Sequence, residues 1–285
     1  MALWQALGRL EPRVDRGWAN AGAFRDETPL VAERGHKISA FCILEAMNFP
    51  TPQWHDELPS TNTTLAEWSR EGRDLPDGYV LAARAQTAGR GRYQRRWLAR
   101  PGRNLTFSTL LRCQAPQMQL LSLPMAAALG VAAYLEANGL VAQTKWPNDV
   151  LVDGRKICGI LAERGEGVVL GMGLNVNMDA DEAAAIDRPA TSMRIETGRE
   201  YAVEAVLDEL LHHLAVWIGR WQAGGFAALR EAWGVRCANI GEYVEVGEGA
   251  DRRTGVVLGF GEAGQLLLRE DDGTRGEVWT GDVGN

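Results

Sequence analysis

The sequence predicts an α+β protein with a separate, small β-domain at its C-terminal end. From about residue 54 to residue 236, runs rich in β-forming residues alternate with helical patterns. From Gly241, short strand-like runs separated by turn residues replace the helices, as in a small antiparallel barrel. The 285 residues are 46% hydrophobic, enough for one large core and a satellite domain. We expect residues 1–50 to be an N-terminal extension of unknown structure, 51–236 the main domain and 237–285 the small domain.

Charge and cysteine content narrow the class of protein. The net charge of −7 argues against nucleic acid as the main partner, so any anion site must be local. No charged and then apolar leader is readable at the start, and the longest apolar stretch, residues 120–135, is too short to span a bilayer. The cysteines have no metal-ligand spacing and predict neither a zinc site nor a disulfide framework. We therefore expect a cytoplasmic protein with no membrane partner and no dedicated metal site.

The first 50 residues form no recognisable domain. They carry six basic and six acidic residues and show no three-helix pattern. This balance argues against a module that reads DNA.

A helix is predicted to begin at Ser60-Thr61-Asn62. Apolar residues follow at helical spacing, and Gly72 is a natural stop. Ser60 or Thr61 can cap the helix, which explains these residues without any ligand. A helix N-terminus also offers backbone N–H groups to a bound polar molecule, so capping and binding are compatible.

The most unusual stretch is residues 86–97, which we call the arginine loop. It joins two predicted strands, 79–83 and 105–111, and carries two glycines and four arginines. Glycines allow a close approach of the backbone, and guanidinium groups match carboxylate and phosphate oxygens. Taken alone, the loop could equally be a solvated turn.

Further along, a long buried helix is predicted over 118–138, and Asp153-Gly154 is a hairpin signal between two apolar runs. The hairpin places Lys156 near the start of a core strand, where snorkelling to water is the alternative explanation. The next strand, 168–177, has alternating glycines that permit close approach of a ligand. One apolar stripe then predicts a helical region over 200–233.

These motifs, in this order, resemble biotin-protein ligase from about residue 54 to the C-terminus. They are Ser60-Thr61-Asn62, the arginine loop ending at Trp97, Lys145-Trp146-Pro147-Asn148-Asp149, Arg155-Lys156 with Gly159-Ile160-Leu161, and Gly171 and Gly173 with Asn175. The resemblance implies a central mixed sheet flanked by helices, as in class II synthetase-like ligases, and an SH3-like C-terminal barrel. It also implies that the protein uses ATP to make biotinyl-5'-AMP. Biotin would then pass to one lysine of the biotin carboxyl carrier protein of acetyl-CoA carboxylase or a related carboxylase.

The resemblance also assigns site residues. The biotin site would comprise Ser60, Thr61, Asn62, Gln86, Arg90, Gly91, Arg92, Lys156 and Gly159. The nucleotide site would comprise Arg90, Arg92, Trp97, Lys156 and Asn175. The catalytic residues would be Lys156, Arg92 and Asp149.

The residue types suit this chemistry. Attack of the biotin carboxylate on the α-phosphorus brings two anions together, so fixed cations such as Lys156 are required. The arginine loop can fold down over the adenylate and exclude water. Asp149 could orient or deprotonate the carrier amine, or it could be a turn residue that pairs with Lys145. Mg²⁺ is expected with ATP rather than in a protein cage.

Several alternatives stay open. Lipoate-protein ligase shares the same two-step logic, and some biotin ligases are also biotin-responsive repressors. A silent relative that only binds biotin is a third possibility. Tyr93 and Gln94 depart from the basic or small residues often found in this loop. The N-terminal segment does not resemble a winged helix, so no DNA partner is expected, and either a monomer or a homodimer is compatible with the sequence.

Overall fold

The computed structural model of the protein describes residues 47–97, 99–113, 115–247 and 252–284. The interpretation of the N-terminal segment, including its expected lack of a DNA-reading module, falls almost entirely outside these described residues.

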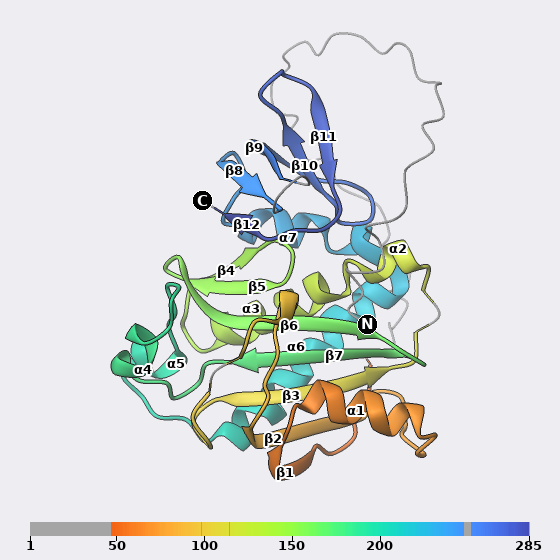
Figure 1. Ribbon diagram of the computed structural model, residues 1–285, viewed down its shortest axis with the longest axis vertical. Coiled ribbons are helices and arrows are strands. Elements are labelled where there is room, and N and C mark those ends of the chain that lie inside the picture. Colours follow the sequence, from red (N-terminus) through yellow and green to blue (C-terminus); the bar gives the residue numbers. More distant parts are fainter. Residues whose placement is uncertain (1–46, 98, 114, 248–251, 285) are drawn as a thin grey trace, which may run out of the picture.

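A mixed β-sheet forms the centre of the main domain (Figure 1). Its seven strands, within the described part of the chain, run in the order β1-β2-β3-β7-β6-β5-β4. β1 is parallel to β2 and every other neighbouring pair is antiparallel, which confirms the expected mixed sheet. The strands are β1 (Gln53–Leu58), β2 (Val80–Gln86), β3 (Leu105–Leu111), β4 (Ala142–Lys145), β5 (Asp149–Val152), β6 (Arg155–Arg164) and β7 (Val168–Leu174).

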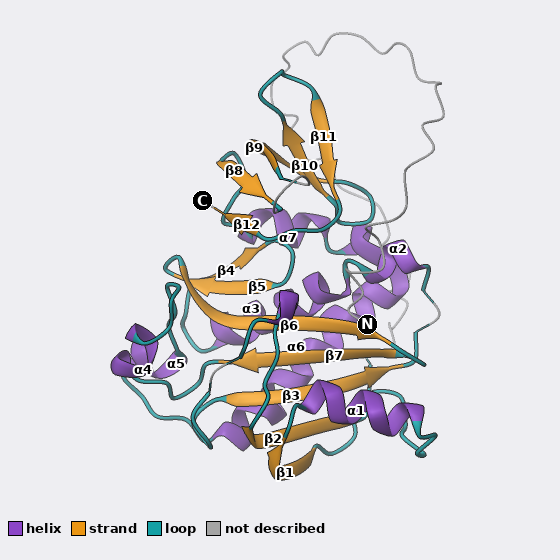
Figure 2. Ribbon diagram, in the orientation of Figure 1, coloured by secondary structure: helices purple, strands orange, loops and turns teal. Residues whose placement is uncertain are grey.

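Helices lie on both faces of this sheet (Figure 2). On one face, α3 packs along α6 and shares the large core with the strands. On the other face, Leu65 of α1 packs with Leu81, Leu110 and Val169 in a smaller core. The helices are α1 (Thr61–Arg70), α2 (Gln117–Leu120), α3 (Leu123–Ala137), α4 (Ala180–Ala184), α5 (Met193–Thr197), α6 (Val203–Gly224) and α7 (Arg230–Arg236).

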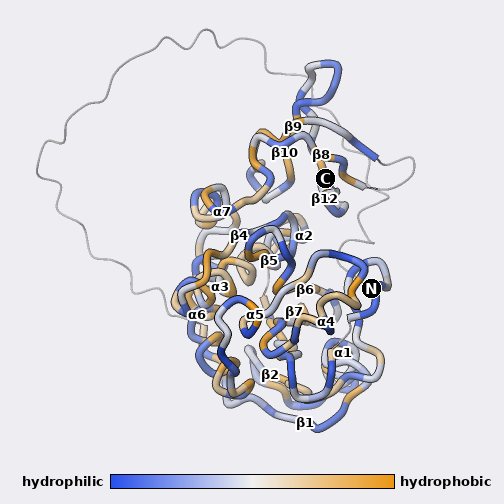
Figure 3. The backbone as a smooth tube through the Cα atoms, turned by 90° about the vertical axis from the view of Figure 1, so that its left-hand side faces the viewer, coloured by the Kyte–Doolittle hydropathy of each residue, from blue (hydrophilic) through white to orange (hydrophobic). Residues whose placement is uncertain are grey.

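The helix predicted over 118–138 is two helices, because the chain turns at Ser122. The Ser122 hydroxyl donates to Gln119 O (2.8 Å) and accepts from Trp221 Nε1 (3.0 Å). Pro124, in the first turn of α3, lacks the N–H that would continue the ladder from α2. The span Gln117–Ala137 is long and apolar enough to cross a membrane, but 83% of its most apolar window is buried. It is therefore a core element, and Figure 3 shows the hydrophobic colour along α3.

The predicted helical region 200–233 is also divided. A short 3-10 turn, Gly225–Ala228, separates α6 from α7, and Gly225 has a positive φ of 59°. Glycine tolerates this backbone conformation without steric strain.

The C-terminal residues form a five-stranded antiparallel sheet in the order β11-β10-β9-β8-β12. This fits the expected SH3-like domain, although β12 was not among the predicted strands. Phe260 packs edge-on against Phe226 and Trp233 of the main domain, and Trp146 Nε1 donates to Gly264 O (3.0 Å). The two parts therefore share one packed interface, and their boundary at residue 237 stays a prediction. The strands are β8 (Tyr243–Val246), β9 (Arg253–Phe260), β10 (Leu266–Arg269), β11 (Arg275–Val278) and β12 (Val283–Gly284).

Candidate active site

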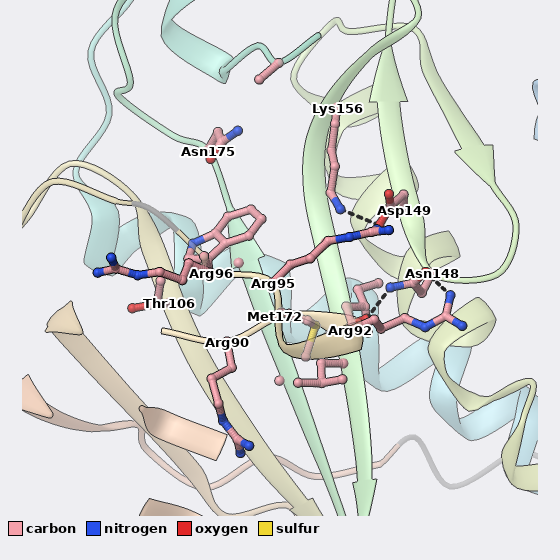
Figure 4. Close-up of a pocket in the computed structure, with 18 of the residues that line it drawn as sticks. Arg90, Arg92, Arg95, Arg96, Thr106, Asn148, Asp149, Lys156, Met172 and Asn175 are labelled. Carbon is pink, nitrogen blue, oxygen red and sulfur yellow. Dashed lines mark hydrogen bonds and ion pairs between the residues drawn. The ribbon is translucent and has the colours of Figure 1, made fainter. Parts of the chain in front are cut away.

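A cavity of about 490 Å³ opens beside the start of α1, beneath the arginine loop (Figure 4). Every site residue expected from the sequence lines it, although their individual roles stay predictions. These residues are Ser60, Thr61, Asn62, Gln86, Arg90, Gly91, Arg92, Trp97, Asp149, Lys156, Gly159 and Asn175.

The start of α1 supplies neutral hydrogen-bonding groups. Ser60 is the N-cap, as predicted, and its hydroxyl accepts from Thr63 N (3.4 Å). Thr61 N donates to Gln86 Oε1 (2.7 Å), and the Thr61 hydroxyl lies 3.3 Å from the same oxygen. Gln86 is the last residue of β2, so this contact joins the helix start to the beginning of the arginine loop.

Asn62 is held from three sides. Its Nδ2 donates to Glu163 Oε2 (3.0 Å), and its Oδ1 accepts from Ser108 Oγ (2.6 Å). A Cβ atom at Gly171 would lie only 1.9 Å from Asn62 Oδ1, so a glycine is required beneath this side chain. The amide is therefore oriented before any ligand enters.

Glycines of two paired strands form the floor of the cavity under Trp97. Gly159 of β6 lies opposite Gly173 of β7. A Cβ at Gly173 would come within 2.3 Å of the Trp97 indole, and one at Gly159 would come within 3.3 Å. The ring therefore lies directly on the sheet, where it can stack against a planar ligand only if its face is accessible from the cavity.

A β-bulge aims Lys156 into the cavity. Residues three apart in a regular strand point to opposite faces, yet Lys156 and Gly159 both line the cavity. The register between β5 and β6 shifts at Ile157. This extra residue reverses the alternation of side chains along the strand, so that Lys156 and Gly159 face the same side of the sheet. A Cβ at Gly159 would lie 3.0 Å from Lys156 Nζ, so the lysine folds back over the glycine. Its Nζ lies 2.7 Å from Asp149 Oδ1. A dashed line marks this ion pair in Figure 4.

This ion pair bears on the alternative interpretation of Asp149. Asp149 begins β5 and lies opposite Lys145 in the strand register. Its carboxylate, however, pairs with Lys156 rather than with Lys145. Burial lowers the pKa of Lys145, and the nearby charges of Asp149 and Asp282 partly offset this effect. Asp149 thus lines the cavity and does not form the expected pair with Lys145, while its catalytic role stays a prediction.

Arg90 and Arg92 of the loop have carboxylate partners. Arg90 Nη2 lies 3.2 Å from Glu163 Oε2, the oxygen that also accepts from Asn62. Arg92 is buried, with its side chain 5% exposed, and donates to Asn148 Oδ1 (3.2 Å) and Asp282 Oδ1 (2.7 Å). The solvated turn considered for this loop is wrong for Arg92, because tertiary partners enclose its guanidinium group.

Several cavity or support residues carried no clear signal in the sequence. Ser108 was visible only as a polar residue in an apolar strand, and Asn148 only as a member of a motif. Glu163 lies two residues beyond the motif that contains Lys156, whereas residues 185–190 and Asp282 had no distinguishing pattern. Residues 185–190 form the wall beyond β6, where Lys156 N donates to Pro189 O (2.9 Å).

The site combines neutral hydrogen-bonding groups, an aromatic ring on a glycine floor and clustered cations on a mixed sheet. We expect this arrangement of a ligase that activates a carboxylate with a nucleotide. Residues 54–179 match the biotin/lipoate A/B protein ligase family. A biotin–[acetyl-CoA-carboxylase] ligase of Paracoccus denitrificans is 35% identical over 226 residues, which cover 74% of this chain and 92% of that protein. The chain belongs to the biotin-protein ligase family.

Two further relatives extend the comparison. The bifunctional ligase/repressor BirA of Bacillus subtilis is 29% identical over 238 residues, covering 81% of this chain and 72% of that protein. Among solved structures, the biotin protein ligase of Aquifex aeolicus in complex with biotin and ATP superimposes with a TM-score of 0.72 at 29% identity. That match covers 83% of this chain and 98% of the Aquifex chain.

Proposed function

We propose that this protein is a biotin–[biotin carboxyl carrier protein] ligase. It adenylates biotin with ATP and transfers the biotinyl group to a lysine of the carrier protein. One observation supports this proposal most strongly. The same cavity contains the neutral hydrogen-bonding groups at the start of α1, the glycine floor under Trp97 and the Lys156–Asp149 ion pair. The similarity to ligases of known name and to a complex with biotin and ATP supports the same activity.

In the first step, a carboxylate oxygen of biotin attacks the α-phosphorus of ATP. A bond forms between this oxygen and phosphorus, and the bond to the pyrophosphate oxygen breaks. Lys156 supplies a point charge from a rigid strand, and Arg92 supplies forked donors next to the same cavity. Thr61, Asn62 and Gln86 would hold the uncharged ureido ring, since they offer oriented neutral donors and acceptors.

In the second step, the amine of the carrier lysine attacks the carbonyl carbon of the mixed anhydride, and AMP leaves. The amine must lose a proton. Asp149 is our candidate to accept that proton or to orient the amine, since its carboxylate lies in the cavity beside Lys156. Exchanging the ion pair for contact with the substrate amine would free the carboxylate for this role.

We expect Mg²⁺ to enter with the nucleotide phosphates. Among the described residues, no group of three or more His, Cys, Asp or Glu side chains could hold a metal ion. The cavity carboxylate Asp149 faces the cationic side chain of Lys156, so it suits shared contact with a hydrated ion better than a closed cage. The ion would neutralise charge on the phosphates.

The partner would be the biotin carboxyl carrier protein of acetyl-CoA carboxylase or of a related carboxylase, in the cytoplasm.

We also propose that no DNA partner is involved. A mobility-shift assay at low salt with random-sequence and promoter DNA tests this point, because electrostatic binding is strongest there. Sequence-specific binding would assign the protein to the bifunctional ligase/repressors. Sedimentation with and without biotinyl-5'-AMP would separate monomer from homodimer.

To test the enzymatic proposal, the purified protein is incubated with ATP, Mg²⁺ and either biotin or lipoate. We expect pyrophosphate release with biotin, and labelling of the lysine when a carrier domain is added. Release with lipoate alone would assign the protein to the lipoate ligases of the same family. Biotin binding without any release would identify a silent relative.

A further inference from the structure

Asp282 of the small domain reaches into the cavity of the main domain. It lies between β11 and β12 and lines the cavity together with the arginine loop. Its Oδ1 accepts from Arg92 Nη1 (2.7 Å), and its Oδ2 pairs with Arg95 Nη1. The carbonyl of Gly281 accepts from Arg92 as well (3.1 Å). One carboxylate of the C-terminal domain therefore binds two arginines of the same loop.

The arginine loop turns at Tyr93, and this turn brings Arg92 and Arg95 to the same carboxylate. Tyr93, between the two arginines in the chain, has a φ of 53°, which a non-glycine residue adopts at a cost of about 1–2 kcal/mol. The guanidinium carbons of Arg92 and Arg95 lie 4.9 and 5.6 Å from the centre of the Tyr93 ring. The turn at Tyr93 thus directs both arginines toward Asp282.

Electrostatics explains why the carboxylate is needed. Two guanidinium groups on one short loop repel each other, and the side chain of Arg92 is 5% exposed, so water screens its charge poorly. Asn148 adds a neutral acceptor on the other side of Arg92 at 3.2 Å. Asp282 holds Arg92 by a charge-assisted hydrogen bond, so replacing its carboxylate with a neutral group weakens the hold on Arg92 and loosens the loop.

We infer that Asp282 is a positioning residue, through which the small domain holds the arginine loop in the conformation that places Arg92 against the nucleotide. This inference rests on the proposed function for its catalytic consequence, but the contact itself is independent of it. The small domain then contributes to adenylation without touching biotin, and it does so through the loop.

The test compares Asp282→Asn, Asp282→Glu and Glu242→Gln with the unmodified protein. Glu242 is exposed on the same domain and serves as the matched charge control. Asparagine should lower kcat/KM for ATP about ten- to a hundredfold, the range for losing a hydrogen bond to a charged group. Glutamate, which keeps the charge, should restore most of it, and the melting temperature should change little.

Limited trypsin digestion gives a readout that needs no activity. Cleavage after Arg92 and Arg95 should be at least fivefold faster in Asp282→Asn, with cleavage after Arg199, in the exposed turn before α6, as the internal reference. Unchanged cleavage would overturn the inference even if the protein ligates biotin. Faster cleavage in a protein that releases no pyrophosphate would sustain the contact and overturn only the proposed function. A loss of activity matched by a fall in melting temperature, with no rescue by glutamate, would assign Asp282 to folding and also overturn the inference.

Discussion

Replacing Lys156 by methionine removes a charge while it keeps most of the side-chain volume. Nζ lies 2.7 Å from Asp149 Oδ1, and the side chain is 34% exposed. A unit charge about 4 Å from a developing phosphoryl charge contributes about 4 kcal/mol at an effective dielectric constant of about 20. Partial exposure and the opposite charge of Asp149 reduce this value. We therefore expect a loss of about 3 kcal/mol, which is roughly a hundredfold in kcat and lies within the range for one preorganised donor.

The assay is pyrophosphate release at saturating ATP and biotin, followed continuously. Arg164→Gln is the matched control, because it removes one positive charge from the exposed end of the same strand. We expect it to keep kcat within about twofold of the unmodified protein, since an exposed charge is screened by water and salt. A melting curve for each variant separates loss of rate from loss of fold.

One result would refute this reasoning. If Lys156→Met releases pyrophosphate within threefold of the unmodified rate while the protein stays folded, Lys156 is a snorkelling core lysine and not a catalytic residue. If both variants lose rate equally, net charge rather than the position of Lys156 controls the reaction.

Three further outcomes follow from the geometry. Gly173→Ala should lower kcat/KM for ATP at least tenfold, because its Cβ would lie 2.3 Å from the Trp97 indole; steady-state kinetics checks this. Ser108→Ala should raise the Kd for biotin about fivefold or more in calorimetry, because a buried partner of Asn62 Oδ1 is lost. Burial raises the pKa of Cys158 above 9.0, so the folded protein keeps a proton that the unfolded chain releases. Stability should therefore be fully present below about pH 9 and decline above it, by up to about 1.4 kcal/mol per pH unit, and Cys158→Ala should make this decline shallower in urea titrations at pH 8 and 10.

Each of these outcomes has a control variant or a result that would contradict it. Gly234→Ala, on α7 with no heavy atom within 4 Å of its added Cβ, should be neutral or slightly stabilising. For Ser108→Ala, an unchanged Kd for biotin together with a lower melting temperature would show that the hydroxyl serves only the fold. An equally steep alkaline decline in Cys158→Ala would assign the effect to other groups, of which Tyr134 has a pKa raised by burial.

Most of the fold could be predicted from local sequence patterns. Periodicity and turn chemistry located β2, β3 and the four longer C-terminal strands to within a few residues. The Asp153-Gly154 hairpin is confirmed, with φ values of 50° and 69° at the two turn residues. The break at Ser122 was missed although Pro124 is a local signal for it, and the hydrogen bond that Trp221 donates to Ser122 from 99 residues away has no local signature. β12 was missed because two residues are too short to show a period.

The membership of the cavity was largely predictable, because the motifs contain most of its polar residues, whereas Thr106, Asp187, Arg188 and Asp282 lie outside them. The hydrogen-bond and ion-pair partners of the cavity residues were not predictable from the sequence. Glu163 binds both Arg90 and Asn62, and neither contact has a local signature, since such pairs depend on which strand lies beside which loop.

The amino-acid sequence alone specified the residue types that meet in the site, the glycines beneath them and the family to which the chain belongs, since these follow from local spacing and order. The direction in which Lys156 points depends on a bulge at Ile157 that exists only when β5 and β6 pair. The confinement of Arg92 depends on Asp282, which lies 190 residues further along the chain and reaches the loop only after two domains have packed together. Long-range pairing decides these features because the energies of burial and charge act between neighbours in space, whatever their separation in the chain.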